Sequence, residues 1–361
     1  MFSRYLYMTF ILLFVCCATA YAELQYQVIA IDEAIQAFDI NNAGQVVGFG
    51  QYSRGFVWQD GIINHLEPVD GSHYSSAYNI NEYGQIVGRL DGHATLWSGD
   101  TITDIGVLPG YSYSQALDIN DNGQVIGHST YGDYPYSTDR AFFWENGVMQ
   151  EIGTFGGAHS QALAINNKGQ VVGWADLQDQ LRAHAFIWEN GVMTEIGLSP
   201  EYQSDPDPPG SRALDINDKG QVLVGNGGTW IWENGNWTKI LAEYMPEASY
   251  IRSRAMNNVG DIIGLAIFEE DTPSRPFLWR DGTIYDLSTL IPADSNWRLR
   301  EVYAINDYGW IVGTGSYKDE GDINWKGGAF LLTPVPEPSS VFALGLAMFG
   351  TGLGWVRRKK K

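Results

Sequence analysis

The chain has 361 residues, of which 42 are glycine and 13% are aromatic, and its formal net charge is -20. This length allows one large domain or two ordinary ones, and so many glycines favour a turn-rich, all-β protein over a helical one. An acidic surface repels phosphate backbones, so we expect no nucleic-acid partner.

Residues 1–22 have the pattern of a secretory signal peptide. Arg4 precedes an apolar run over 5–17, and residues 20–22 form an A-x-A cleavage pattern. Cys16 and Cys17 are the only cysteines and lie inside this segment. The exported protein is therefore expected to have no disulfide, no thiol chemistry and no cysteine metal site.

A strand-turn-strand motif occurs seven times within 23–332. Each copy has an apolar residue, then Asn, then Gly three positions later, followed by an apolar pair. An Asn-x-x-Gly segment between apolar runs predicts a hairpin built on a type I turn, where Gly takes the left-handed position. The motif asparagines are Asn41, Asn81, Asn120, Asn166, Asn217, Asn257 and Asn306.

A second hairpin follows the motif in each of the first six repeats. A short apolar strand ending in Trp precedes a two-residue turn, as in 142–144 before Asn146-Gly147. Such turns are the strongest short hairpin signal. Each repeat therefore predicts four strands, which we call a, b, c and d. A spacing of 39 to 51 residues between motifs, with this strand content, indicates a β-propeller.

The two ends of the repeat region complement each other. The seventh repeat has strands a, b and c, the last at 330–332, but no strand d. An alternating strand at 24–31 precedes the first motif and belongs to no complete repeat. We predict that this strand completes the last blade and closes the ring, which covers two sheet edges. The expected fold is an all-β, seven-bladed propeller of four-stranded blades.

The last residues, 333–361, combine three ordered features. A Pro-Glu-Pro motif is followed by the mostly apolar stretch 340–356 and by five basic residues at 357–361. Seventeen such residues suffice for a short transmembrane helix, and the positive-inside rule places the basic tail in the cytoplasm.

This segment closely resembles the PEP-CTERM sorting signal of exporting Gram-negative bacteria, whose motif matches Pro336, Glu337 and Pro338. The resemblance implies transient anchoring in the inner membrane. It also implies that an exosortase-type membrane protease recognises the motif and removes the helix, which releases the body to the cell surface or extracellular matrix.

The repeats resemble HAF repeats, an extracellular repeat family named after a His-Ala-Phe tripeptide found here at 184–186. The Ile-Asn-x-x-Gly-Gln-Val-Val-Gly core and the Phe-x-Trp strand carry the resemblance from residue 37 to about 330. Thr95 replaces the Phe of one repeat, and Asp261 and Trp310 replace Gln in two others. The resemblance implies no established reaction.

One motif copy fits the beginning of a calcium loop, with the D-x-N-x-N-G pattern at 118–123. Other repeats carry Lys168 and Lys219 at the position of Asn122, and Ser129 stands where the loop requires Glu. Lysine is incompatible with a calcium ligand position, so we interpret the segment as a turn. We expect neither a metal nor a cofactor.

Five basic or imidazole side chains share one position, four residues before the last residue of strand c: Arg54, His93, Arg140, His184 and Arg275. They suit an anion site, or ion pairs with the acids two residues before the motif Asn, which are Asp39, Asp118 and Asp215. We favour the ion pairs because the position repeats with the scaffold.

The tight a–b and c–d turns lie at one end of the blades, so the longer b–c and d–a connections share the opposite face, here called the long-loop face. Residues specific to single repeats gather in these connections, as function usually does in repeat folds. Tyrosine, tryptophan and acids suit a wet, polar ligand. The candidates are His73, Tyr74, Tyr111, Tyr113, Tyr131, Tyr134, Tyr136, His159, Trp174, Asp205, Asp207 and Trp297.

No Ser-His-Asp set, paired histidine motif or glycine-rich phosphate loop occurs at a usable spacing, so we expect no catalytic residues. The sequence predicts an exported, non-catalytic surface or matrix protein that binds exopolysaccharide or an envelope protein through its long-loop face. Two alternatives stay open, an extracellular polysaccharide hydrolase or lyase with carboxylates on the same face, and a purely structural matrix component.

Overall fold

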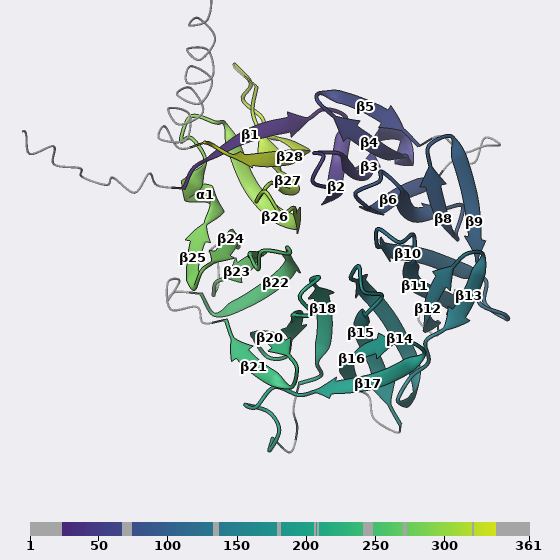
Figure 1. Ribbon diagram of the computed structural model, residues 1–361. Coiled ribbons are helices and arrows are strands. Elements are labelled where there is room, and N and C mark those ends of the chain that lie inside the picture. Colours follow the sequence, from purple (N-terminus) through teal and green to yellow (C-terminus); the bar gives the residue numbers. More distant parts are fainter. Residues whose placement is uncertain are drawn as a thin grey trace, which may run out of the picture. The chain divides into compact units, whose positions relative to one another are not determined.

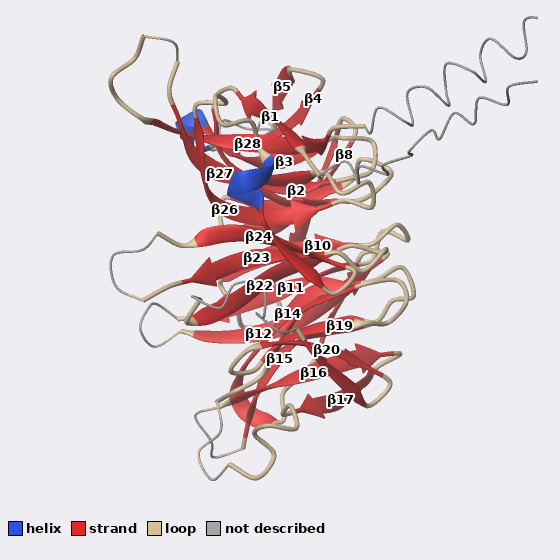
Figure 2. Ribbon diagram, turned by 90° about the vertical axis from the view of Figure 1, so that its left-hand side faces the viewer, coloured by secondary structure: helices blue, strands red, loops and turns tan. Residues whose placement is uncertain are grey.

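In the described part of the chain, the apolar runs of the repeats form 28 strands in seven four-stranded antiparallel sheets, arranged as blades around a central channel (Figure 1). Figure 2 shows the sheets from the side, with strands running between two loop-bearing faces. This computed structural model describes residues 24–66, 74–132, 137–178, 182–205, 207, 209–240, 248–269, 273–319 and 321–336. Residues Tyr26–Pro334 form one compact unit.

The innermost strand of each blade is strand a, and strand b lies next to it. The a strands are β2 (Ala34–Ile40), β6 (Ser75–Ile80), β10 (Tyr113–Ile119), β14 (Gly156–Ile165), β18 (Arg212–Ile216), β22 (Tyr250–Met256) and β26 (Trp297–Ile305). The b strands are β3 (Val46–Gly50), β7 (Ile86–Leu90), β11 (Val125–Tyr131), β15 (Val171–Leu177), β19 (Val222–Gly225), β23 (Ile262–Ile267) and β27 (Ile311–Tyr317).

Strand c follows outward, and strand d forms the outer edge. The c strands are β4 (Gly55–Gln59), β8 (His93–Ser98), β12 (Thr138–Glu145), β16 (Ala183–Glu189), β20 (Thr229–Glu233), β24 (Arg275–Arg280) and β28 (Lys326–Pro334). The d strands are β5 (Ile62–His65), β9 (Thr101–Gly106), β13 (Val148–Glu151), β17 (Val192–Gly197), β21 (Asn236–Lys239), β25 (Thr283–Asp286) and β1 (Tyr26–Ile31). Two short helical turns, η1 (Gln51–Ser53) and α1 (Leu287–Leu290), complete the described elements.

The first strand of the chain closes the last blade, as the sequence predicts. β1 pairs antiparallel with β28, with Val28 opposite Leu332, so the last sheet has the order β1-β28-β27-β26. Tyr26 is fully buried and its hydroxyl donates a hydrogen bond to the carbonyl O of Gly309 at 3.1 Å. The predicted seven-bladed propeller is confirmed.

The core lies between neighbouring blades. Val46 and Phe56 of the first blade belong to one buried cluster with Val312 and Leu331 of the last. The next residue, Val47, faces the second blade in another cluster, so strand b is buried on both faces. This double burial explains why the motif carries two consecutive apolar residues at this point.

Every strand a contains a β-bulge three residues before its motif Asn. The a–b register skips one residue in each blade, between Ala37 and Asp39 in the first and between Ala116 and Asp118 in the third. The bulge brings strand a close to strand b, where a Cβ added to Gly127 would lie 1.9 Å from the carbonyl O of Gln115. This close backbone approach favours Gly at the last motif position in six blades, and Val224 takes the position in the fifth.

Within the described ranges, no helix is long and apolar enough to cross a membrane. The predicted signal peptide (1–22), Glu337, Pro338 and the predicted helix at 340–356 lie outside the described residues.

Candidate functional site

The channel has a polar mouth at the a–b turns, built by the motif asparagines. The side-chain Nδ2 of Asn41 donates to Gln45 Oε1 at 2.8 Å and to the carbonyl O of Asn81, in the next blade, at 3.1 Å. The same contact joins each motif Asn to the next blade at 2.9 to 3.4 Å, and Asn306 completes the circle at Asn41. These bonds fasten all seven blades to one another.

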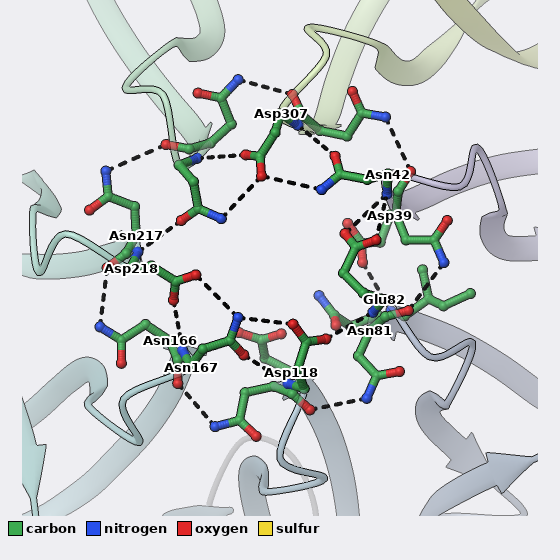
Figure 3. Close-up of a pocket in the computed structure, with 18 of the residues that line it drawn as sticks. Asp39, Asn42, Asn81, Glu82, Asp118, Asn166, Asn167, Asn217, Asp218 and Asp307 are labelled. Atoms are coloured by element: carbon green, nitrogen blue, oxygen red, sulfur yellow. Dashed lines mark hydrogen bonds between the residues drawn. The ribbon is translucent and has the colours of Figure 1, made fainter.

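A second circle lies directly beside the first (Figure 3). The backbone N–H after each motif Asn donates to a side-chain oxygen at the same position of the next blade, at 2.8 to 3.1 Å. The residues at this position are Asn42, Glu82, Asp121, Asn167, Asp218, Asn258 and Asp307. Both circles line a cavity of about 330 Å³, and their polar atoms are used to hold the blades.

Three carboxyl groups lie deeper in the channel wall, in alternate blades. Asp39, Asp118 and Asp215 accept hydrogen bonds from backbone N–H groups of the following blade at 2.6 to 2.9 Å. Burial raises the pKa of Asp39 and Asp215 to about 6 and the pKa of Asp118 well above its usual range. In the described parts of the chain, no group of three His, Cys, Asp or Glu side chains is arranged to hold a metal ion.

The ion pairs predicted between these acids and the repeated basic position are wrong for four of its five residues. His93, Arg140, His184 and Arg275 instead pair with acids eleven residues later, Asp104, Glu151, Glu195 and Asp286. These acids lie on strand d of the same blade, directly beside strand c. The three channel acids lie on strand a, two strands away from strand c, and they bind the neighbouring blade's backbone.

The larger cavity, about 900 Å³, lies on the other side of these acids. Its lining includes residues of the b–c and d–a connections, among them Arg182, Gly210 and Gly227, so it opens on the long-loop face. The bulge residues of all seven blades line this cavity, because a bulge turns an extra side chain toward the channel. They are Phe38, Tyr78, Leu117, Leu163, Leu214, Arg254 and Tyr303.

Aromatic rings and guanidinium groups meet at this cavity. Phe38 packs edge-on against both Tyr78 and Tyr303, each with ring centroids 5.7 Å apart. The guanidinium of Arg254 lies 5.1 Å from the centre of the Tyr303 ring. Burial lowers the pKa of Arg254, and the nearby charge of Arg252 acts in the same direction. The site therefore combines flat apolar surfaces with hydrogen-bond donors of positive charge.

The residues predicted on the long-loop face differ in their surroundings. His73, Tyr134 and Tyr136 lie outside the described residues. Tyr74, Tyr113 and Tyr131 are exposed, and Tyr111 packs edge-on against Tyr131. His159 and Trp297 are held within the blades, as His159 accepts a hydrogen bond from the backbone N–H of Asp139 and Trp297 stacks on Tyr317 at 5.0 Å.

Two predicted residues bear on the cavity indirectly. Trp174 lies beneath the guanidinium of Arg212, which lines the cavity, and Asp207 pairs with Arg182, which also lines it. Asp205 donates its backbone N–H to the carbonyl O of Tyr202 and is exposed. Of the predicted residues that the structure describes, none lines the cavity itself, and their role in binding stays a prediction.

The cavity-lining residues that the sequence did not identify belong to the repeats themselves. Position three before the motif Asn holds Phe, Tyr or Leu in six blades and Arg254 in the remaining one. In an alignment of the repeats, the charged Arg254 stands out at a position that is otherwise Phe, Tyr or Leu, and this was the signal available in the sequence. The bulge that turns this position toward the channel leaves no trace in the apolar pattern.

Two family models match the chain. A model described as Protein of unknown function (DUF3466) matches residues 101–335, and the model of the PEP-CTERM protein-sorting motif matches residues 334–359. The second match confirms the predicted sorting signal. The likeness to HAF repeats stays a prediction, and no curated protein matches the sequence.

Several solved structures are similar to the chain. YCF48 bound to D1 peptide is 11% identical with a TM-score of 0.53, and the match covers 86% of this chain and 96% of that chain. A gluconolactonase from Xanthomonas campestris is 11% identical with a TM-score of 0.43, covering 86% and 90%. TolB from Acinetobacter baumannii is 9% identical with a TM-score of 0.42, covering 86% and 79%. At these identities the likeness concerns the fold alone.

Proposed function

The chain belongs to the DUF3466 family of proteins of unknown function, and from this premise we propose that it is a surface protein that binds polysaccharide in the cavity of its long-loop face. The sorting motif indicates export to the cell surface, with transient membrane anchoring before an exosortase processes the signal. A polysaccharide at the cell surface would be accessible to a protein exported there.

The observation that carries the proposal is the contrast between the two ends of the channel. At the turn end, the polar groups described above already bind one another across the blades. At the long-loop end, a cavity of about 900 Å³ presents aromatic rings and guanidinium groups. A concave site of 300 to about 1,000 Å³ with apolar walls and a few charged groups is typical of ligand binding.

A cavity-filling variant tests this proposal. Leu214 is a bulge residue, and its equivalents in other blades are Phe38, Tyr78 and Tyr303, so the backbone there accepts a large ring. Leu214→Trp is expected to keep the thermal midpoint within a few degrees and to weaken glycan binding at least tenfold on an array probed with the purified full-length chain.

Val192→Trp is the matched control, because Val192 is 64% exposed on the outer strand β17. It is expected to bind as the unmodified chain does. Glycan binding that survives Leu214→Trp would move the site away from the cavity. A blank array together with capture of an envelope protein that Leu214→Trp abolishes would replace the polysaccharide by a protein ligand.

A polysaccharide hydrolase is a second candidate, since Asp39 and Asp118 line the cavity and both have a raised pKa. A carboxyl group with a raised pKa suits general acid catalysis. Release of reducing ends from a bound polysaccharide, lost in Asp118→Asn, would favour this candidate. Binding without any release of reducing ends supports the non-catalytic function.

A further inference from the structure

Four arginines line one side of the large cavity, Arg182, Arg212, Arg252 and Arg254. They come from three consecutive blades: Arg182 immediately precedes β16, Arg212 begins β18, and the other two lie on β22. The whole chain has 22 basic and 42 acidic residues, so this cluster of positive charges is opposite in sign to the net charge of the chain.

The partners of these arginines divide them into two pairs. Arg182 forms a salt bridge with Asp207, and Arg252 forms one with Glu301 at 3.4 Å. Among the described residues, Arg212 and Arg254 have no carboxylate within salt-bridge distance. Their guanidinium groups lie instead over aromatic rings, at 4.7 Å from Trp174 and 5.1 Å from Tyr303.

A guanidinium placed over a ring keeps its in-plane N–H donors available, and these donors match the two oxygens of a carboxylate. Arg252 and Arg254 lie two residues apart on β22, and both line the same wall, so their like charges repel each other. An anionic ligand bound between them would relieve this repulsion. The part of the cavity lined by these arginines therefore has the chemistry of an anion site.

The aromatic and amide residues of the lining favour a sugar as the carrier of the anionic group. Phe38, Tyr78, Tyr250 and Tyr303 line the same cavity, and flat rings pack well against the C–H faces of pyranoses. Asn79 adds an amide to the lining, and an amide can bind sugar hydroxyls.

We propose that the arginine wall of Arg212, Arg252 and Arg254 binds the carboxylates of an acidic polysaccharide, one built from uronic acids. This inference rests on the proposed polysaccharide-binding function and names the class of ligand for that site. The cavity holds a short segment of this polysaccharide. Its carboxylates contact the guanidinium groups, and its sugar rings pack against the aromatic side chains that line the cavity.

The test compares uronic-acid tetrasaccharides, namely galacturonate, glucuronate, mannuronate and guluronate oligomers, with their methyl esters. The ester has the same sugar framework without the negative charge. Calorimetric titration of the purified full-length chain should show at least tenfold tighter binding of one acid oligomer than of its ester. Raising the salt concentration should weaken binding of the acid and not of the ester.

The double variant Arg212→Gln/Arg252→Gln should remove the preference for the acid over the ester. Both side chains are exposed to the channel, so the fold is expected to survive, and the thermal midpoint checks this. Arg275→Gln is the matched control, because Arg275 pairs with Asp286 at the outer part of a blade and does not line the cavity. It should bind the acid oligomer as the unmodified chain does.

The possible outcomes distinguish a failure of this inference from a failure of the proposed polysaccharide binding. Equal binding of acid and ester, weakened by Leu214→Trp, keeps polysaccharide binding and overturns the arginine wall as an anion site. No binding of any acid or ester, together with a blank glycan array, overturns both. Arginine-dependent binding of polyglutamate without binding of any uronic oligomer would assign the wall to an acidic peptide and overturn the sugar class.

Discussion

A single amide side chain per repeat joins neighbouring blades, and its chemistry explains why the motif residue is Asn. In the first blade, Asn41 Nδ2 donates to Gln45 and to the next blade, while Asn41 Oδ1 accepts from the backbone N–H of Gln45 at 3.0 Å. An aspartate offers no donor and a serine is too short to do both. The same residue thus shapes the turn and fastens the ring.

The half-buried acids of the channel predict an unusual dependence of stability on pH. The pKa of Asp39 and Asp215 is about 6 in the folded chain against an ordinary value of 3.8, so the folded state binds more protons between these values. Stability contributed by protonation is therefore fully present below pH 3.8 and is lost as the pH rises through 6. The thermal midpoint is expected to rise when the pH falls from 7.5 to 5.

Asp39→Asn/Asp215→Asn should flatten this pH dependence and stabilise the propeller at pH 7.5 by on the order of 2 kcal/mol per residue, less the hydrogen bonds that Asn makes poorly. Asn79 occupies the same position in the second blade, so the amide fits there. The exposed Asp100→Asn is the control for general charge effects. A double variant with the pH slope of the unmodified chain would contradict the assignment.

At the scale of single elements, two features of the strands decide the geometry of the channel. The bulge in strand a points one side chain per blade into the channel, and in six of the seven blades a glycine of strand b lies against the bulged backbone. The strand β1 supplies the outer edge of the last blade from the other end of the repeat region. Its anchor is Tyr26, which is fully buried.

Tyr26→Ala is expected to destabilise the propeller by about 3 to 5 kcal/mol, because it leaves a large cavity under β1. Loss of β1 would expose the edge of β28, so the variant should also self-associate on gel filtration. Tyr26→Phe keeps the ring and loses only the hydrogen bond to Gly309, so about 1 to 2 kcal/mol is expected. Urea denaturation measures both, and equal stability of the two variants would show that β1 is not anchored by this ring.

At the scale of the whole molecule, the ring has no terminal blade. Two circles of hydrogen bonds and the shared core clusters join every blade to both neighbours, including the first to the last. Open repeat arrays lose cooperativity because their ends unfold first. A closed ring removes such ends.

Calorimetry of the full-length chain should therefore show one unfolding transition with equal calorimetric and van't Hoff enthalpies. Tyr26→Ala, which weakens the closure, should give a broader transition with a lower van't Hoff enthalpy. Two resolved transitions in the unmodified chain would indicate that part of the ring unfolds independently.

Much of the architecture is visible in the sequence because it rests on local chemistry. Turn residues such as Asn-x-x-Gly and Asn-Gly, apolar pairs and a missing outer strand predict the hairpins, the blades and the closure by residues 26–31, all of which the structure confirms. The sorting signal is equally local, since its motif, apolar stretch and basic tail are adjacent in the chain.

The candidate site was decided only by the tertiary structure. Arg182, Arg212 and Arg254 come from different blades, and their meeting in one cavity depends on how far each blade is rotated about the channel and on the bulges that redirect side chains. Asp118 binds a backbone N–H that is 47 positions away in the sequence. Such contacts arise from packing between blades, and the spacing of residues within one repeat contains no information about it.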